Sequence, residues 1–385
     1  MNKTSVFKIK IDFEKSHGSY VFDKNTNTKY LDFMGMYSSL PIGYNHPIFN
    51  THEFKKEIEL VSKLKVVNCE MLSDEFEEFY KKFKTFTSLN MYKNYHFTCT
   101  GALANEAAIK TAMWHKGPRP DGYILSIKNS FHGINSVGNI ITTRFPGVKL
   151  RQGNIPGEYM WPVANSIEDA ISHVKLNPYN LQGVIIEPIQ ATYGDNYLNK
   201  KQLKRLATVC KKYNIPLIFD EVQTGFLTSG TVWYFEQLGI YPDIVTFGKK
   251  SQVSGIMVKE SHSEAFNQQK RLSVTYDGDL IDMIRCKYII KVLDNNIQEN
   301  VKKRGNQLYK GLSKLKQIQN VRQTGLLIAF DFDTTLERDT FYKQLYNYGM
   351  ICNPTGEKSI RMRPNLCVTK QEISDALVLI KQCIN

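Results

Sequence analysis

The strongest constraint on the fold is the alternation of short apolar runs and helical stretches between residues 90 and 250. The runs YHFTCT, YILSI, GVIIEP, PLIF and DIVTF have the length and composition of buried strands. Between the third and fourth runs, a segment from about 199 to 213 carries its apolar residues at helical spacing. This alternation predicts a mostly parallel sheet covered on both faces by helices, which is the α/β class.

The chain of 385 residues is long enough for two domains. Residues 1–50 have the pattern of short strands and turns, with VFKIKIDF, GSYVFD and KYLDF as the strand candidates. We predict that this N-terminal segment is part of a small α+β domain completed by residues 276–385. There, a long helical run over 280–315 precedes the strand candidates GLLIAFDF and SIRMRP. Residues 51–275 form the predicted large domain.

The overall composition is that of an ordinary globular protein, with 42% apolar and 23% charged residues. No apolar run approaches the roughly 18 residues of a membrane-spanning helix. The segment MNKTSVFKIKIDFEK lacks the apolar core and cleavage site of a signal peptide. We therefore expect a cytoplasmic protein with no membrane partner.

Neither the cysteines nor the net charge indicates a special ligand. The seven cysteines form no CxxC pair and no metal-ligand cluster with histidine, so free thiols and no metal are expected. The formal net charge is +13, but the lysines are interspersed with glutamates, as in EFEEFYKKFK. This pattern is typical of a solvated surface and does not favour nucleic acid as a partner.

Two chemically distinct side chains follow two of the strand candidates. Asp220 ends PLIFD, and Lys249 comes just after DIVTFG. The carboxyl ends of strands in an open α/β sheet meet at one edge, so the two groups can converge on a small molecule. A lysine can form a Schiff base with an aldehyde and a carboxylate can keep a pyridine nitrogen protonated, which is the layout of a pyridoxal phosphate (PLP) site. Two solvated loop residues would give the same pattern, so both interpretations stay open.

Two further features have a functional and a structural interpretation. Gly101 and Ala102 join a strand candidate to a helical segment, where backbone N–H groups and the helix dipole can hold a phosphate. A tight turn without a ligand explains the same residues. Phe131, in the loop NSFHG, either stacks on a flat ring or belongs to the core.

Several motifs occur together along nearly the whole chain. They are GSYVFD, KYLDF, GYNHP, TGALANEAAIK, FHG, GVIIEPIQ, LIFDEVQTG, PDIVTFGKK, RLSVTYDGDLIDMIR and SIRMRPNLCVT. In this order they resemble class III PLP-dependent aminotransferases of fold type I. Within that family, GALA, FGKKSQVSG and GDLIDMIR are most similar to L-lysine 6-aminotransferases.

The resemblance implies a role for each matched residue. Lys249 would bind the cofactor covalently and move a proton, while Lys250 would be structural or solvent-facing. Asp220 would pair with the pyridine nitrogen, and Arg361, with Arg363 as a weaker candidate, would receive a substrate carboxylate. The implied cofactor contacts also include Gly101, Ala102, Phe131, His132, Glu187, Gln223 and Thr275. Thr275 would reach the phosphate of a neighbouring subunit, which implies a homodimer with shared sites.

The chain departs from the family at two positions that bear on the substrate. Thr192 stands where family members carry a glutamate that masks the carboxylate-binding arginine, so either Arg361 stays unpaired or Tyr193 occludes part of the pocket. Ile134 follows FHG, where similar lysine 6-aminotransferases carry an arginine. We therefore expect a donor with a terminal amine on a more apolar body than lysine, unless Arg144 substitutes for the missing cation.

The expected activity is transfer of a terminal amino group from an amino acid or amine donor to a 2-oxo acid such as 2-oxoglutarate. The motifs leave open another PLP reaction, namely that of an aminomutase, a decarboxylase or a racemase. A non-catalytic binding protein on the same fold is a remote alternative.

Overall fold

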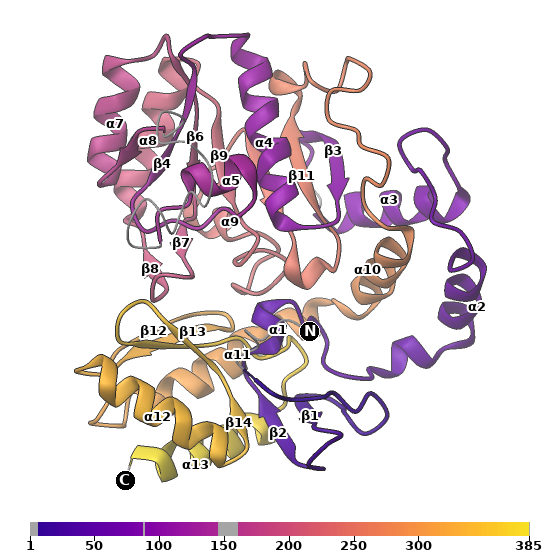
Figure 1. Ribbon diagram of the computed structural model, residues 1–385, viewed down its shortest axis with the longest axis vertical. Helices are drawn as coiled ribbons and strands as arrows, with labels where there is room; N and C mark the ends of the chain where they lie inside the picture. Colours follow the sequence, from indigo (N-terminus) through magenta and orange to yellow (C-terminus); the bar gives the residue numbers. More distant parts are fainter. Residues whose placement is uncertain (1–6, 88, 145–160, 385) are drawn as a thin grey trace.

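The computed structural model describes residues 7–87, 89–144 and 161–384 (Figure 1). Its larger part is built on a seven-stranded sheet with the order β3-β11-β10-β9-β6-β4-β5. Strand β11 is antiparallel to both of its neighbours, and the other pairings are parallel. The predicted mostly parallel α/β sheet is therefore confirmed. The strands are β3 (Tyr92–Thr98), β4 (Tyr123–Ile127), β5 (Val163–Ala164), β6 (Leu181–Ile186), β9 (Leu217–Asp220), β10 (Ile244–Phe247) and β11 (Ser254–Lys259).

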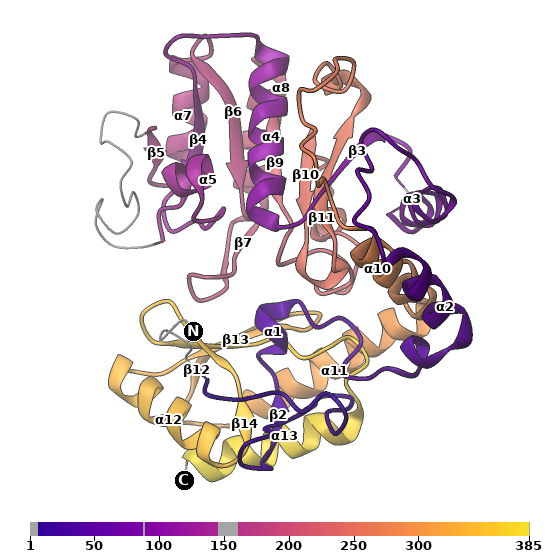
Figure 2. The ribbon, with the colours of Figure 1, turned by 45° about the vertical axis from the view of Figure 1, so that its right-hand side comes forward.

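Helices cover this sheet on both faces because its strands point apolar side chains both ways. Ile218 of β9 packs in a cluster with the alanines of α4 (Gly101–Lys116). Its neighbours Leu217 and Phe219 belong to the other core, together with apolar residues of α7 (Ile167–Leu176) and α8 (Lys200–Lys212). Figure 2 shows α4 running alongside the strands. The strand ends are thereby fixed relative to the start of α4.

The smaller part of the molecule joins the two ends of the chain. A four-stranded antiparallel sheet has the order β12-β13-β16-β15, and a second sheet pairs β2 with β14. In Figure 1 these elements lie below the large sheet. The strands are β1 (Tyr20–Phe22), β2 (Lys29–Asp32), β12 (Gln319–Thr324), β13 (Leu327–Asp331), β14 (Met350–Ile351), β15 (Asn353–Thr355) and β16 (Ser359–Met362), and helices α12 (Thr335–Asn347) and α13 (Lys370–Ile384) pack beside them.

Two local predictions are wrong. The run over 280–315 is not one helix but α10 (Leu280–Val292) and α11 (Asn295–Leu312), because Asp294 accepts a hydrogen bond from the backbone N–H of Ile297 and starts a new helix. The described part of VFKIKIDF forms a single bridge, at Ile11, rather than a strand. The side chain of Asp23 accepts from the backbone N–H of Lys10 and so replaces a strand partner there.

Short elements and the remaining helices complete the described chain. None of the helices in the described ranges is long and apolar enough to cross a membrane. The elements are α1 (Gly35–Ser38), η1 (Pro47–Asn50), α2 (His52–Val61), α3 (Asp74–Thr87), α5 (Ser136–Ile141), β7 (Ile189–Gln190), β8 (Asn196–Tyr197), α9 (Tyr234–Leu238), η3 (Lys249–Ser251) and η4 (Glu260–His262).

Candidate active site

A cavity of about 590 Å³ lies at the carboxyl ends of β3, β4, β6, β9 and β10. Ligands of open α/β sheets bind at this edge, since the loops that follow the strands converge there. Except for Thr275 and the weaker candidate Arg363, all of the predicted site residues line the cavity: Gly101, Ala102, Phe131, His132, Ile134, Glu187, Thr192, Asp220, Gln223, Lys249 and Arg361. It also includes residues that the sequence did not single out, namely Tyr37, Thr100, Asn105, Gly133, Asn135 and Val222, and it includes Arg144.

Asp220 is the last residue of β9 and is held by three hydrogen bonds. Its Oδ2 accepts from Nδ1 of His132 and from Nδ2 of Asn105, each at 2.8 Å, and its Oδ1 accepts from the backbone N–H of Val222 at 3.1 Å. His132 and Asn105 are both buried, and Nε2 of His132 has no partner within the described chain. The Asp220 carboxylate therefore has a fixed orientation at the cavity wall.

Lys249 lines the cavity, and its neighbour Lys250 does not. Lys249 has a left-handed backbone conformation, with φ at 56°. Burial, aided by the charge of Arg361, lowers the pKa of the Lys249 amine to about 8. Lys250 points elsewhere and donates hydrogen bonds to the carbonyls of Leu40 at 3.0 Å and Pro364 at 3.3 Å. Lys249 thus places an amine of lowered pKa at the cavity wall, while Lys250 ties two chain segments together.

Glu187 follows β6 and is buried at the same edge of the sheet. Its Oε1 accepts from the backbone N–H of Phe131 at 2.7 Å. Burial, and then the nearby charge of Asp220, raise the pKa of Glu187 well above its ordinary value. Glu187 fixes the loop that carries Phe131.

The N-terminus of α4 opens into the cavity. Thr100 caps the helix by accepting from the N–H of Leu103 at 3.3 Å, which leaves the amides of Gly101 and Ala102 at the cavity wall. The FHG loop comes very close to this helix start. A Cβ atom on Gly133, whose φ is 113°, would lie 2.9 Å from Cβ of Ala102, so a glycine is required there.

Arg361 lies on β16 and is buried at the cavity wall. Its Nη1 donates to the carbonyl of Ala191 at 2.6 Å, and among the described residues it forms no ion pair within 4.0 Å. Thr192 lines the same cavity, and its buried hydroxyl has no partner within the described chain. Arg363, the weaker candidate, is not a lining residue, because it forms a fully buried ion pair with Asp195.

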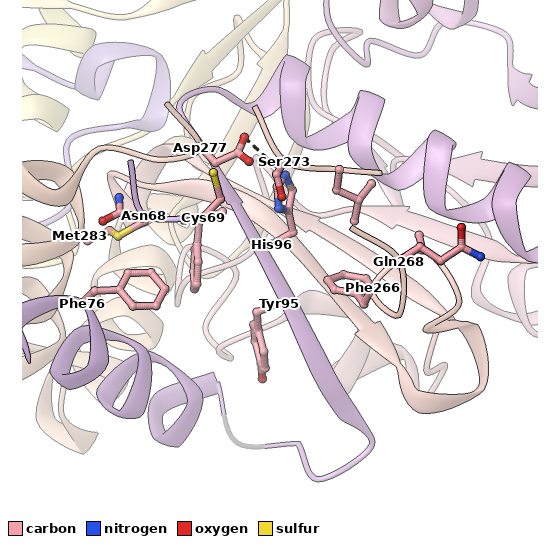
Figure 3. A pocket seen from close by; sticks show the side chains of 13 residues that line it. Asn68, Cys69, Phe76, Tyr95, His96, Phe266, Gln268, Ser273, Asp277 and Met283 are labelled. Carbon is pink, nitrogen blue, oxygen red and sulfur yellow. Dashed lines mark ion pairs between the residues drawn. The ribbon is translucent and has the colours of Figure 1, made fainter. Parts of the chain in front are cut away.

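Thr275 is not a lining residue of this cavity and lies on an exposed loop between η4 and α10. Asp277 holds that loop by accepting from the N–H of Val274 at 2.7 Å, and its other oxygen lies 3.7 Å from Nε2 of His96 on β3. Figure 3 shows Asp277 and His96 in a separate pocket of about 230 Å³. Burial raises the pKa of Asp277 to about 6 and lowers that of His96 to about 4, so the pair carries one negative charge at neutral pH.

A lysine, an acid and a helix N-terminus at the carboxyl edge of this sheet define the site of a fold type I PLP-dependent enzyme. The family model of the class III aminotransferases matches residues 1–384, so the chain belongs to that family. It is therefore a PLP-dependent aminotransferase.

Named relatives agree with this assignment. The chain is 30% identical over 413 residues to the L-lysine-epsilon aminotransferase of Mycobacterium bovis, covering 98% of this chain and 92% of the relative. It is 29% identical over 436 residues to the 4-aminobutyrate aminotransferase of Schizosaccharomyces pombe, covering 98% of this chain and 89% of the relative. The solved structure of lysine aminotransferase from M. tuberculosis in the internal aldimine form has a TM-score of 0.93 and 28% identity, covering 100% of this chain and 96% of that one.

The residues of the cavity fit PLP in chemical type. A buried amine suits the aldehyde, an oriented carboxylate suits the ring nitrogen, and free amides at a helix N-terminus suit the phosphate. Gln223 also places a buried Oε1 there without a partner in the described chain.

Proposed function

We propose that this aminotransferase moves a terminal amino group from a carboxylate-bearing donor to a 2-oxo acid such as 2-oxoglutarate. The observation that carries this proposal is that Lys249 and Arg361 line one cavity, with Arg361 forming no ion pair among the described residues. A free guanidinium binds a substrate carboxylate in a bidentate manner while the amine faces Lys249. The names of the lysine and 4-aminobutyrate aminotransferase relatives support a terminal amine.

Lys249 is the proposed catalytic base. PLP supplies an aldehyde and an electron-withdrawing ring, which together make the carbon next to the substrate amine acidic. Lys249 would hold the cofactor covalently until a substrate amine displaces it, and would then carry the proton between substrate carbon and cofactor. An amine with its pKa lowered to about 8 by burial suits both roles, because the unprotonated share at pH 7, about a tenth, is far larger than that of an ordinary lysine.

Asp220 is proposed to keep the ring nitrogen protonated, which stabilises negative charge that develops on the substrate. Its two side-chain donors, His132 and Asn105, hold the carboxylate at the cavity wall. Phe131 would cover a face of the ring, with Glu187 fixing its loop, and Gln223 would contact the ring hydroxyl. These assignments rest on position in the cavity and on residue chemistry.

The phosphate is proposed to bind the amides of Gly101 and Ala102 and the hydroxyl of Thr275 of the partner subunit. Thr275 is exposed and does not line the cavity of its own subunit. A residue that contributes to the site of a neighbouring subunit needs to be exposed in this way. The proposal therefore includes a homodimer with shared sites. It also includes a cytoplasmic location, supported by seven cysteines that are all free thiols.

The experiment that tests this function is a panel of diamines, ω-amino acids and α-amino acids, each offered with 2-oxoglutarate and with pyruvate. We expect amine loss from a terminal-amine donor to match, mole for mole, amine gain by the 2-oxo acid. Lys249→Ala serves as the inactive control. Turnover of a donor without any added 2-oxo acid would instead identify a mutase, decarboxylase or racemase.

A further inference from the structure

The loop that carries Thr275 is tied down on both sides of that residue. Asp277 accepts a hydrogen bond from the backbone N–H of Val274 at 2.7 Å, so its carboxylate bridges the residues before and after Thr275. Among the described residues, the hydroxyl of Thr275 itself has no hydrogen-bond partner, and the residue is exposed. The loop is thus closed on itself around one free hydroxyl.

Side chains from two neighbouring segments also hold this loop. One segment precedes α3, and the other directly follows β3. Each donor bonds a backbone carbonyl of the loop: Cys69 Sγ that of Val274 at 3.6 Å, Asn68 Nδ2 that of Gly278 at 3.3 Å, and Cys99 Sγ that of Tyr276 at 3.3 Å. The backbone is therefore fixed immediately before and immediately after Thr275, and the Thr275 side chain is left out of these contacts.

Asp277 is the buried end of the loop. It is 7% exposed, whereas residues 273–276 are exposed. Figure 3 shows its carboxylate pointing toward His96, which lies on β3 in the large sheet, with 3.7 Å between Oδ1 and Nε2. That distance is longer than a hydrogen bond, so the firm contact of the carboxylate is the one to Val274. The loop is anchored through a buried acid beside a strand, while Thr275 stays at the surface.

We propose that Asp277 is a positioning residue for the cofactor phosphate, because it fixes the backbone around Thr275 and so presents the Thr275 hydroxyl to the cavity of the partner subunit. This inference rests on the proposed function, in which Thr275 contacts that phosphate, and deepens it. A loop that is already ordered loses little conformational freedom when it binds, so its hydroxyl contributes more to affinity. Asp277 acts through Thr275 and does not itself touch the cofactor.

The test compares PLP with pyridoxal, which lacks the phosphate, in calorimetric titrations of the full-length apoenzyme. The titrations are done at pH 8, because burial raises the pKa of Asp277 to about 6 and the carboxylate is ionised there. Asp277→Ala should weaken PLP about 10-fold, the loss typical of one charge-assisted contact, and change pyridoxal by less than about 3-fold. Asp277→Asn keeps an oxygen acceptor and should restore PLP affinity to within about 3-fold of the wild type.

A double-mutant cycle with Thr275→Ala tests whether the two residues act together. If Asp277 acts through Thr275, the double variant should bind PLP within about 3-fold of Thr275→Ala alone. Losses that multiply, equal losses for PLP and pyridoxal, or no loss of PLP affinity in Asp277→Ala would each overturn the role of Asp277.

Asp169→Ala is the matched control, because Asp169 also accepts from a backbone N–H, that of Asn165 at 2.8 Å, and does not line the cavity. It should leave the affinity for both ligands unchanged. These titrations need no turnover, so they separate this inference from the proposed function. If the variants bind PLP and pyridoxal as expected but the wild type aminates no 2-oxo acid, the proposed amine transfer alone is overturned.

Discussion

Asp220 and His132 form a buried hydrogen bond of 2.8 Å between Oδ2 and Nδ1 at the carboxyl edge of the sheet. Because a carboxylate oxygen only accepts, Nδ1 of His132 carries the proton in this arrangement. The histidine comes from the loop after β4 and the aspartate from the end of β9, so the bond joins two strand ends. This bond orients the Asp220 carboxylate. Among the described residues, no lysine or arginine forms an ion pair with that carboxylate.

Asp220→Asn should lower kcat about 100- to 1000-fold, because the neutral amide cannot stabilise a charged ring nitrogen. The amide keeps the size of the side chain, so the cofactor should remain bound. Absorbance of the bound cofactor and the rate with the best donor measure the two effects separately. A rate within a few-fold of the wild type would show that Asp220 has no electrostatic role.

Glu221 gives a prediction about pH and stability. It is fully buried, and burial raises its pKa to about 7 from an ordinary 4.5. Since the folded state favours the protonated form, the stabilisation is complete below pH 4.5 and is lost as pH rises through 7. The free energy of unfolding should therefore fall by about 3 kcal/mol across this range.

Glu221→Gln should flatten that dependence, although it loses an acceptor for the N–H groups of Tyr234 and Phe235. Urea unfolding of both proteins between pH 4.5 and 8 provides the comparison. Parallel curves for the two proteins would mean that Glu221 is ionised in the folded state throughout.

Thr192→Glu should place a carboxylate next to Arg361, because both residues line the same cavity and the Thr192 hydroxyl has no partner in the described chain. A new ion pair would compete with the substrate carboxylate, so KM for 2-oxoglutarate should rise about 10-fold or more. Thr192→Gln is the control of matched size and should have a much smaller effect. If the glutamate variant keeps the donor and acceptor preferences of the wild type, Arg361 is not the carboxylate site.

Gly133→Ala should destabilise the enzyme by about 1–3 kcal/mol and weaken cofactor binding. The added Cβ would lie 2.9 Å from Cβ of Ala102 at the start of α4, and φ at 113° is unfavourable for alanine. Adding Ala102→Gly removes the contact but not the backbone strain, so it should restore the stability only in part. Thermal unfolding of the single and double variants measures the loss and recovery of stability. Full recovery in the double variant would show that backbone strain at residue 133 does not contribute.

The sequence predicted the sheet and most of the residues around the cavity, because strand ends can be located from short apolar runs. Asp220 is the last residue of β9 and Lys249 lies two residues after β10, so their positions needed no knowledge of the loops. Asn105 could not be found in this way. It lies inside α4, and only the packing of that helix on the sheet shows that it turns toward Asp220.

Other features depend on contacts between distant segments. Arg144 reaches the cavity because backbone bonds to Ser130 fold its segment back. The break between α10 and α11 depends on Asp294, which caps the start of α11. In the sequence, Asp294 cannot be told apart from the other polar residues of a continuous helical pattern. Whether Thr275 serves a partner subunit depends on a second chain.

Borohydride reduction of the holoenzyme followed by peptide mass spectrometry tests most directly whether Lys249 carries the cofactor. Lys250 is the natural internal control, since burial lowers the pKa of its amine to about 7 but its Nζ is bound to two backbone carbonyls. We predict a pyridoxyl group on Lys249 alone, and in apoenzyme reconstitution a rate of attachment that rises with pH toward about 8. A label on Lys250, or on neither lysine, would contradict it.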